Sequence, residues 1–194
     1  MKYYLKNKEF YYSEEVYEPK EDSYLMAENI KFEAKKKVLD MGCGSGIQSM
    51  NALIQNCEVI AVDLNPKALE ITKQNSKQIK KEKKIKTIQS NLFEKIKKQK
   101  FDYILFNPPY VPSDRIKYIE LDGGKKGREI LNKFLEEAPK WITEKGKIYF
   151  IQTNINGIKE TKNILKKYKL KMCKKATKKE FFEELYLIQA EKEE

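Results

Sequence analysis

Val38-Leu-Asp-Met-Gly-Cys-Gly-Ser-Gly46 joins a short apolar run to a cluster of glycines, and a helical stretch begins directly after it at Ile47. A buried strand, a glycine turn and a helix in this order predict the start of a βαβ unit. The spacing G-x-G-x-G departs from the G-x-G-x-x-G of dinucleotide-binding proteins, and the Gly-Lys-Ser/Thr ending of a phosphate-binding loop is missing. Asp40 at the strand tip, beside backbone exposed by Gly42 and Gly44, instead suits a ligand that carries an amino acid.

A second strand is expected over Glu58-Val-Ile-Ala-Val-Asp63, and it ends in a carboxylate. Asp63 lies 21 positions after Gly42 (63 minus 42), where a ribose-binding acid sits in this kind of βαβ unit. Asp63 could alternatively cap the helix that begins near Pro66, but Asn65 can serve as that cap. We therefore expect Asp63 to accept hydrogen bonds from both hydroxyls of a ribose.

Phe101-Asp-Tyr-Ile-Leu-Phe106 predicts another buried strand, and it leads into Asn107-Pro-Pro-Tyr110. The two prolines cannot donate backbone hydrogen bonds, so the carbonyl oxygens here stay free to accept. The Asn107 side-chain oxygen and the Pro108 carbonyl could together accept both protons of a planar NH2 group, with the Tyr110 ring lying flat against it. A rigid loop with an Asx-type turn is the alternative explanation. The position directly after a buried strand favours a reaction site.

Two further segments could border the same pocket. A third strand over residues 85–90 is less apolar and is expected near a sheet edge; after it, Asn91 could read an adenine edge and Leu92 or Phe93 could supply an apolar wall. Near the N-terminus, a helix is expected after Pro19. Its acidic residues at 21 and 22 suit the positive end of the helix dipole, and Ser23 could approach a ligand.

The remaining pattern completes an α/β chain. Residues 1–17 read as an extended or hairpin segment, and an amphipathic helix is expected around residues 130–138. Gly146 is expected to precede a fifth strand over Lys147–Gln152, and a helix over 157–168 follows it. Two final runs, at 170–177 and 184–190, predict an antiparallel hairpin at the sheet edge. We expect one domain over residues 1–194.

Composition narrows the chemistry. The sequence has no histidine, which removes the usual general base, metal ligand and partner of a serine or cysteine nucleophile. Its three cysteines, Cys43, Cys57 and Cys173, are widely spaced and include no CxxC pair, so neither a disulfide framework nor a metal site is expected. No apolar run approaches membrane-spanning length and no signal core begins the chain, so we expect a cytoplasmic protein without a membrane partner.

The net charge of +11 raises the possibility of a nucleic-acid partner. All but two of the 40 basic residues are lysines, the two being Arg115 and Arg128, whereas proteins that read nucleic acids lean on arginine. Lysines mixed with glutamates along every expected helix are more typical of a solvated surface. Binding of nucleic acid is therefore possible but not favoured.

Taken in order, the motif at residues 40–46, Asp63 and Asn107-Pro-Pro-Tyr110 resemble those of the Rossmann-like S-adenosylmethionine methyltransferases, and the HemK family in particular. Val16-Tyr-Glu-Pro-Lys-Glu-Asp22 and Gly123-Gly-Lys-Lys-Gly-Arg-Glu129 resemble segments that mark its short archaeal and eukaryotic branch. Members of this branch methylate the glutamine of the Gly-Gly-Gln loop in class 1 release factors. The resemblance covers nearly the whole chain, which lacks the N-terminal helical domain of the bacterial members.

This resemblance implies a class I methyltransferase fold: an α/β domain with a seven-stranded, mostly parallel sheet, a C-terminal antiparallel hairpin and helices on both faces. It implies S-adenosylmethionine as cofactor. The residues it places against the cofactor are Ser23, Asp40, Gly42, Gly44, Asp63, Asn91, Leu92 and Asn107. Asn107, Pro108 and Tyr110 would hold the glutamine amide as catalytic residues. The resemblance also implies a class 1 release factor as substrate and a heterodimer with a small zinc-binding activator protein, docked on a strand edge near the third strand.

The expected reaction is direct in-line transfer of the sulfonium methyl group to the N5 amide nitrogen of the glutamine, with no separate base. Three alternatives remain. An adenine methyltransferase acting on RNA or DNA would use the same acceptors, but the chain has no target-recognition domain. A lysine methyltransferase would need a base to deprotonate the charged amine. A scaffold that only binds the cofactor would not need residues 107–110.

Overall fold

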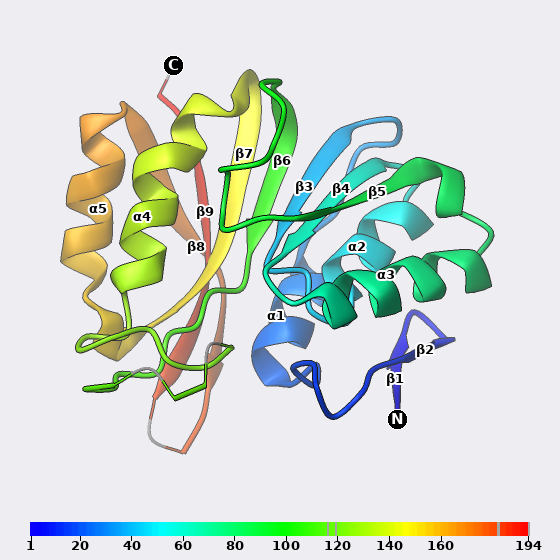
Figure 1. Cartoon of the computed structure of the whole chain (residues 1–194). Helices are drawn as coiled ribbons and strands as arrows, with labels where there is room; N and C mark the ends of the chain where they lie inside the picture. The colour runs from blue at the N-terminus through cyan, green and yellow to red at the C-terminus, as the bar shows by residue number, and fades with distance from the viewer. Residues whose placement is uncertain (116, 119, 182, 194) are drawn as a thin grey trace.

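A seven-stranded sheet with two layers of helices forms the body of the protein in a computed structural model that describes residues 1–115, 117–118, 120–181 and 183–193 (Figure 1). The strand order is β5-β4-β3-β6-β7-β9-β8, and β1 and β2 form a separate two-stranded sheet. All neighbouring pairs in the large sheet are parallel except those made by β9. The α/β fold with its C-terminal antiparallel hairpin is the one predicted from the sequence.

The helices and strands have the following bounds. The strands are β1 (Lys2–Leu5), β2 (Lys8–Tyr11), β3 (Lys37–Met41), β4 (Glu58–Asp63), β5 (Ile85–Gln89), β6 (Phe101–Phe106), β7 (Ile142–Thr153), β8 (Leu170–Lys179) and β9 (Glu184–Lys192). The α-helices are α1 (Glu21–Asn29), α2 (Ile47–Ile54), α3 (Pro66–Gln78), α4 (Glu129–Glu137) and α5 (Ile158–Lys167). Short 3-10 turns are η1 (Glu82–Lys84), η2 (Ala138–Lys140) and η3 (Asn154–Asn156).

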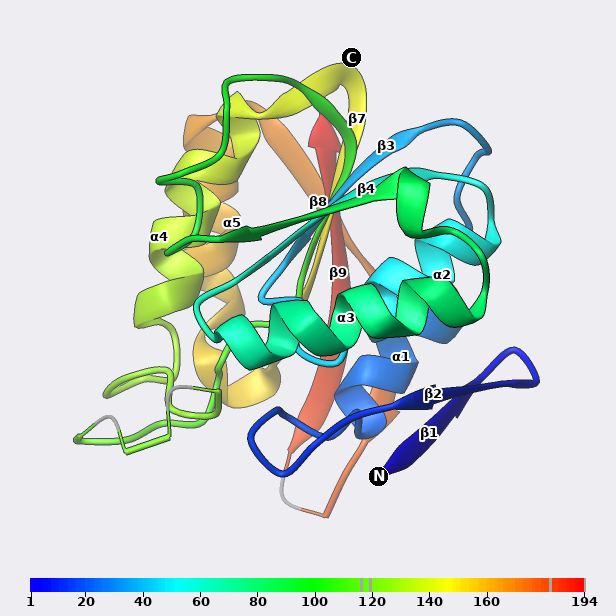
Figure 2. The same cartoon turned by 45° about the vertical axis from the view of Figure 1, so that its right-hand side comes forward.

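The central strands are buried on both faces, which explains their continuous apolar runs. Along β6, Tyr103 and Leu105 pack in the core that contains residues of α1 and α2. Ile104 and Phe106 pack on the other face, with residues of α4 and α5. Figures 1 and 2 show these two groups of helices on opposite sides of the sheet. Successive side chains of a strand point to opposite faces of the sheet. Because both faces are covered by helices, apolar side chains are needed at successive positions.

The strand β7 is longer than the sequence indicated, because it begins at Ile142 and includes Gly146 instead of starting after it. Its pairing with β6 shifts register between Phe101 and Tyr103. A Cβ at Gly146 would lie 2.9 Å from the Phe101 carbonyl oxygen and 2.8 Å from the Ile142 Cβ. The glycine thus marks a close approach inside an irregular strand, where a glycine commonly has that role.

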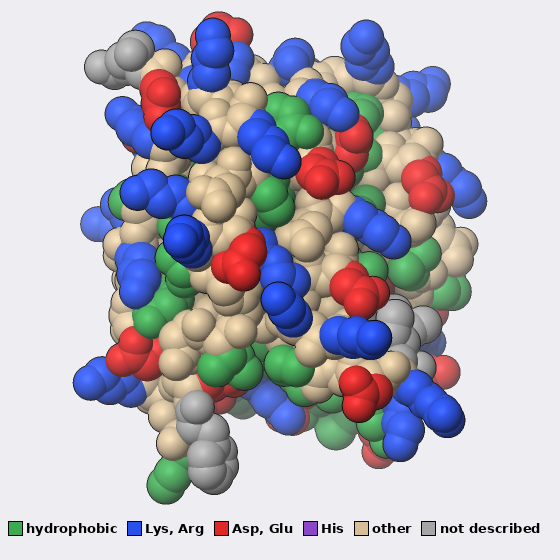
Figure 3. Space-filling view, turned by 90° about the vertical axis from the view of Figure 1, so that its left-hand side faces the viewer, with side chains coloured by type: hydrophobic (Ala, Val, Ile, Leu, Met, Phe, Trp, Pro, Cys, Tyr) green, Lys and Arg blue, Asp and Glu red, His purple; other side chains and the backbone are tan. Residues whose placement is uncertain are grey.

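Both sheet edges carry polar strands. Among the residues that the structure describes, β5 pairs with β4 alone, at one edge of the sheet, as its weaker apolar pattern predicted. At the other edge lies β8, paired with β9 as the expected hairpin. On the face that carries α4 and α5, lysines are spread among acidic side chains (Figure 3), which agrees with a solvated surface.

The N-terminal hairpin is fixed to the glycine turn. Asn75 of α3 accepts a hydrogen bond from the Tyr11 amide (2.9 Å) and donates to the carbonyls of Tyr11 (2.8 Å) and Ser45 (2.9 Å). The Tyr3 hydroxyl also donates to the Ser45 carbonyl (3.3 Å). These contacts join β1 and β2 to Ser45, in the glycine turn after β3. Within the described part of the chain, no helix has the length and apolar character needed to cross a membrane.

Candidate functional site

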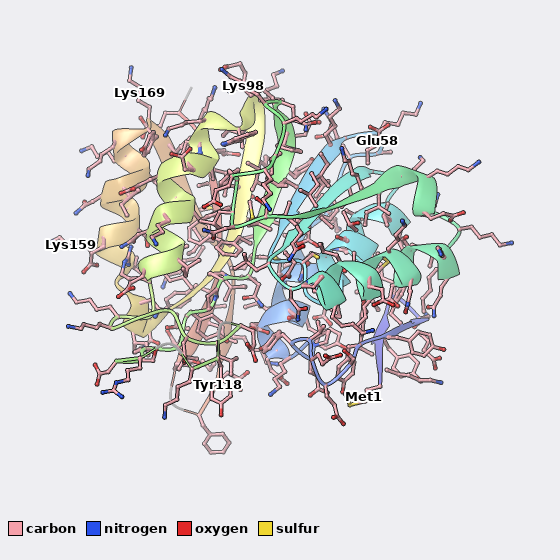
Figure 4. The ribbon with its side chains drawn as sticks, in the orientation of Figure 1. Met1, Glu58, Lys98, Tyr118, Lys159 and Lys169 are labelled. Carbon is pink, nitrogen blue, oxygen red and sulfur yellow. The ribbon has the colours of Figure 1, made fainter. Side chains whose placement is uncertain are left out.

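A cavity of about 470 Å³ opens at the carboxyl ends of the parallel strands. It lies beside β3, where the strand order reverses. The strands β4 and β5 follow on one side of β3, and β6 and β7 follow on the other side. Such a point of reversal is where open α/β sheets bind ligands, and the volume suits a small molecule. In Figure 4, Tyr118 lies at this end of the sheet and Glu58, at the start of β4, lies at the other.

The glycine turn forms one wall of the cavity. Gly42 and Gly44 both line it, as predicted, and both have left-handed backbone conformations, with φ of +62° and +53°. The Gly44 amide donates to the Asp63 carboxylate (2.9 Å). Gly46 has another role, since a Cβ there would lie 2.7 Å from the Thr72 hydroxyl oxygen. The absent side chain lets α2 begin against α3.

Asp40 lies one residue before the end of β3, as a buried carboxylate in the cavity wall. One of its oxygens accepts from the Ser49 amide (2.9 Å) and hydroxyl (2.6 Å) in the first half of α2. Burial raises the pKa of Asp40 from 3.8 to about 7; the nearby Asp63 adds to the rise and the Ser49 hydrogen bonds oppose it. A cationic group in the cavity would favour the ionised carboxylate and lower this pKa again.

Asp63 lies at the tip of β4 and also lines the cavity. Its carboxylate accepts from the amides of Gly44 (2.9 Å) and Asn65 (2.9 Å). Asn65, and not Asp63, caps α3, because its side chain accepts from the Lys67 amide (2.9 Å). Burial raises the pKa of Asp63, against these backbone hydrogen bonds. The capping alternative is therefore removed, and the carboxylate remains at the cavity.

The segment after β5 contributes Asn91 and Leu92 to the cavity wall. The Asn91 side chain is exposed, and its amide group donates to Glu94 (2.8 Å), which leaves its oxygen as the available group. Phe93 was the alternative to Leu92 as an apolar wall. It is instead buried in the core, stacked on Phe134 and Trp141 at centroid distances of 5.9 and 5.2 Å.

The helices α1 and α2 supply Ser23 and a residue that sequence reasoning missed, Gln48. Both side chains are buried and line the cavity. The Gln48 amide donates to the Ser23 carbonyl (2.8 Å), while its buried Oε1 has no hydrogen-bond partner among the described residues. A buried acceptor of this kind needs a donor. Its place two residues after the glycine turn was the only signal in the sequence.

Asn107 lies at the end of β6 with its amide held in one orientation. Its Nδ2 donates to Asp22 (3.0 Å) and lies 3.5 Å from the Ser23 hydroxyl oxygen. Its Oδ1 is buried and has no partner within the described residues. Pro108 and Tyr110 line the cavity beside it. The structure thus brings together the three residues predicted to hold an NH2 group, with the predicted acceptor oxygen unpaired.

Asp22 has more than the helix-terminal role that the sequence suggested. It does lie in the first turn of α1, but it is only 3% exposed and lines the cavity. Its carboxylate accepts from Asn107, from the hydroxyls of Tyr17 (3.0 Å) and Tyr110 (3.2 Å), and from Ser23. Asn107 and Asp22 are 85 positions apart in the chain, so no local pattern could indicate this contact.

A second group of buried polar residues supports the backbone after Tyr110. The Asn156 amide donates to the carbonyls of Tyr110 (2.9 Å) and Lys126 (3.1 Å), and its oxygen accepts from Thr153 in a capping box. A Cβ on Gly127 would overlap the Tyr110 carbonyl oxygen. The Arg128 guanidinium donates to the carbonyls of Asn156 and Gly157, at the start of α5. Residues 126–128 and Asn156 therefore support the backbone of the 107–110 segment at Tyr110.

A cavity beside the strand-order reversal, a glycine turn and a carboxylate at the tip of the next strand are the features of a Rossmann-like α/β domain that binds a small ligand. Residues 12–183 match the methyltransferase small domain, and the chain belongs to that family. Among the residues that the structure describes, no group of three histidine, cysteine or acidic side chains is arranged to hold a metal ion.

Three relatives are particularly similar. Over 183 residues the chain is 39% identical to a "Putative protein N5-glutamine methyltransferase" of Methanocaldococcus jannaschii, covering 91% of each chain. It is 38% identical over 119 residues to the release factor glutamine methyltransferase of Aquifex aeolicus, covering 55% of this chain and 42% of that one. The solved structure of the E. cuniculi Mtq2-Trm112 complex, described as responsible for methylating the translation termination factor eRF1, matches with a TM-score of 0.74 and 28% identity, covering 92% of this chain and 99% of that chain.

Proposed function

We propose that the protein methylates the side-chain amide nitrogen, N5, of the glutamine in the Gly-Gly-Gln motif of a class 1 release factor, with S-adenosylmethionine as methyl donor. The unpaired, buried Oδ1 of Asn107 carries this proposal. A buried acceptor without a donor is costly unless a ligand supplies one. The NH2 group of a glutamine amide has two protons to give. The names of the relatives from Methanocaldococcus jannaschii, Aquifex aeolicus and E. cuniculi support the same acceptor.

The cavity residues fit S-adenosylmethionine. Asp40 and the unpaired Gln48 oxygen suit the ammonium of its amino-acid part, and the Asp63 carboxylate suits the ribose hydroxyls. Ser23, Gly42 and Gly44 line the same wall. The Asn91 oxygen and the Leu92 side chain suit the adenine ring, by hydrogen bond and by contact. When bound, this cofactor supplies an electrophilic methyl group on a sulfonium.

The chain itself then contributes positioning and hydrogen bonds. Asn107 and the Pro108 carbonyl accept the two amide protons, which fixes the NH2 group in place and raises the electron density on its nitrogen. Tyr110 presents a flat ring to the planar amide. Holding the nitrogen in this orientation converts an encounter into a near-attack geometry. The proton on nitrogen can leave after methylation, so the absence of histidine is no obstacle.

We also propose a partner and a place of action. The strand β5 leaves one edge unpaired within the sheet, which suits strand addition by another protein. In the E. cuniculi structure the related protein forms a complex with Trm112. A small zinc-binding activator docked at this edge is the partner we infer, and the cytoplasm, where release factors act, is the compartment.

A labelling experiment tests the proposed function. The purified chain, with and without the activator candidate, is incubated with isotopically labelled S-adenosylmethionine and either a class 1 release factor or total RNA. We expect label on the glutamine of the Gly-Gly-Gln loop, located by mass spectrometry, and none on a release factor whose motif reads Gly-Gly-Glu. Label on adenine or on lysine, or label on nothing with the partner present, would overturn the proposal.

A further inference from the structure

Asp22 is the centre of the hydrogen-bond network at the acceptor end of the cavity. One carboxylate oxygen accepts from Asn107 Nδ2 (3.0 Å), the Tyr17 hydroxyl (3.0 Å) and the Tyr110 hydroxyl (3.2 Å). The other accepts from the amide (2.5 Å) and hydroxyl (3.2 Å) of Ser23. A single buried side chain therefore receives hydrogen bonds from α1, from the segment before it and from the loop after β6.

The chemistry of a carboxylate fixes the direction of each of these bonds. An ionised carboxylate can only accept, so each group that faces it must donate. Asn107 is thereby obliged to turn its NH2 towards Asp22, which leaves its buried oxygen as the unpaired acceptor of the side chain. The Tyr110 hydroxyl must donate its only proton to Asp22. Its oxygen can then act only as a hydrogen-bond acceptor towards any other group.

Tyr17 and Tyr110 remain protonated and can therefore donate to Asp22. Burial, together with the neighbouring Asp22 carboxylate, raises the pKa values of Tyr17 and Tyr110 well above their ordinary value. Both phenols are therefore donors at any physiological pH. Because the neighbouring tyrosines donate to Asp22, they do not donate to Asn107. The Asn107 oxygen therefore has no hydrogen-bond donor among the described residues.

We propose that Asp22 is a specificity-determining positioning residue, which makes the acceptor end of the cavity a surface of hydrogen-bond acceptors that admits an NH2 group and rejects a carboxylate, which has no proton to donate. The inference rests on the proposed function and deepens it. Discrimination between glutamine and glutamate then depends on Asp22 through the orientation that it gives to Asn107. Asp22 acts through Asn107, because only the amide orientation that Asp22 enforces presents an oxygen.

Replacement of Asp22 by Asn tests the role of the carboxylate with little change of shape. The new amide oxygen can still accept from Ser23, but the new NH2 would face the Asn107 NH2. Asn107 is then expected to turn over and present its own NH2 to the cavity. We expect kcat/KM for a Gly-Gly-Gln release factor to fall by about 100-fold, the scale seen when one preorganised hydrogen bond to a reacting group is lost. The Kd for S-adenosylmethionine should stay within about threefold.

The ratio of the affinities for the Gly-Gly-Gln and Gly-Gly-Glu forms distinguishes a positioning role of Asp22 from a purely structural one. Binding of the release factor with Gly-Gly-Gln is compared with binding of its Gly-Gly-Glu form, by calorimetry, for the wild type and Asp22→Asn. We expect the wild-type preference for glutamine to shrink by about tenfold or more in the variant, because the turned amide can donate to a carboxylate. A loss of activity with an unchanged preference would overturn the inference, since a structural defect weakens both ligands alike.

Exchanging the two groups provides a second, independent arm. The variant Asp22→Asn/Asn107→Asp restores one carboxylate and one NH2, and it again leaves an oxygen facing the cavity. We expect it to be at least about tenfold more active than either single variant, a coupling expected only for residues in contact. Losses that simply multiply would overturn the inference.

Glu21 offers the matched control. It lies next to Asp22 in the first turn of α1, but its side chain points to an ion pair with Lys178 (3.5 Å) at the surface. Glu21→Gln removes the same charge from the same helix terminus and should leave kcat/KM and selectivity unchanged; an equal effect would overturn the role of Asp22. If the wild type itself fails to methylate glutamine, the proposed function fails, whereas an active wild type with an unaltered Asp22→Asn variant removes this inference alone.

Discussion

The two ends of the cavity are built in different ways. At the glycine-turn end, the groups that bond one another are close in the chain: Asp40 and Ser49 are 9 positions apart, and Gly44 and Asp63 are 19 apart. At the acceptor end, Asn107 bonds Asp22 across 85 positions and Asn156 bonds Tyr110 across 46. The first end belongs to a single βαβ unit, whereas the second is assembled from three distant segments. Cofactor binding and acceptor recognition should therefore be separable by mutation.

Replacement of Asn107 by Ala should have the largest effect and make this separation plain. Removal of the acceptor oxygen should lower kcat by about 1,000-fold, the upper scale for loss of a preorganised hydrogen bond in an active site. The Kd for S-adenosylmethionine, measured by calorimetry, should change less than about threefold. Joint loss of turnover and cofactor binding would show that the two ends do not function separately.

Asp63→Asn should give the opposite pattern. The amide keeps one acceptor oxygen but loses the charge, and hydrogen bonds to charged groups contribute about 1.5–3 kcal/mol, so we expect the cofactor Kd to rise by about 10- to 100-fold. At saturating cofactor, kcat should remain close to that of the wild type. A variant with normal cofactor affinity would contradict the ribose role of Asp63.

The pH dependence of cofactor binding should report the glycine-turn end alone. With a pKa of about 7, Asp40 is largely protonated at pH 5 in the free protein, and a cationic ligand group favours its ionised form. The Kd for S-adenosylmethionine should therefore fall with rising pH, by up to about tenfold per unit, and level off above pH 7. Asp63, whose pKa is also raised, contributes in the same direction. Titration calorimetry on Asp40→Asn should show a weaker dependence; an identical one would exclude Asp40.

The same group has the reverse effect on the free protein. Between pH 3.8 and about 7 the folded state holds a proton on Asp40 that the unfolded state has released. Stability falls with rising pH wherever the folded state binds more protons. Asp40 therefore lowers the free energy of unfolding across this window, and saturating cofactor should reduce that loss. Chemical denaturation at pH 5 and pH 8, with Asp40→Asn as control, measures it.

Asn156→Ala should have the smallest effect and test the support behind Tyr110. The variant loses the bonds to the Tyr110 and Lys126 carbonyls and the capping box with Thr153. Buried groups left unpaired cost about 1–3 kcal/mol each, so the melting temperature should fall. We expect KM for the release factor to rise about five- to tenfold, with cofactor Kd unchanged. A change in cofactor Kd as large as that in KM would mean that the support extends to both ends.

The contrast between the two ends also explains what the sequence could predict. The glycine turn, Asp63 and the continuous apolar runs are local patterns, so the sheet, its helices and the glycine-turn wall followed from them. Asn107, Pro108 and Tyr110 were predicted as site residues because their own chemistry is unusual at the end of a strand, and the structure places them in the cavity wall. Asp22 and Gln48 were missed as site residues, because an acid in a first helical turn and a glutamine in a helix have ordinary explanations.

Errors in the elements have a similar origin. The strand β7 was expected to start after Gly146, since an isolated glycine suggests an interruption. Close packing of that residue on Phe101 and Ile142 permits the strand to continue, and packing of this kind depends on the neighbouring strand. Phe93 could not be assigned to the core or the cavity until its stacking on Trp141 was known.

The bond between Tyr11 and Asn75 has a consequence for the order of events during synthesis. The hairpin β1–β2 is synthesised before α3, yet an isolated two-stranded hairpin is marginally stable in water. Its anchor, Asn75, is translated 64 positions later than Tyr11, and the same side chain secures the Ser45 carbonyl in the glycine turn. The cavity wall that contains the glycine turn is therefore completed only after α3 has been synthesised and Asn75 has bonded both Tyr11 and Ser45.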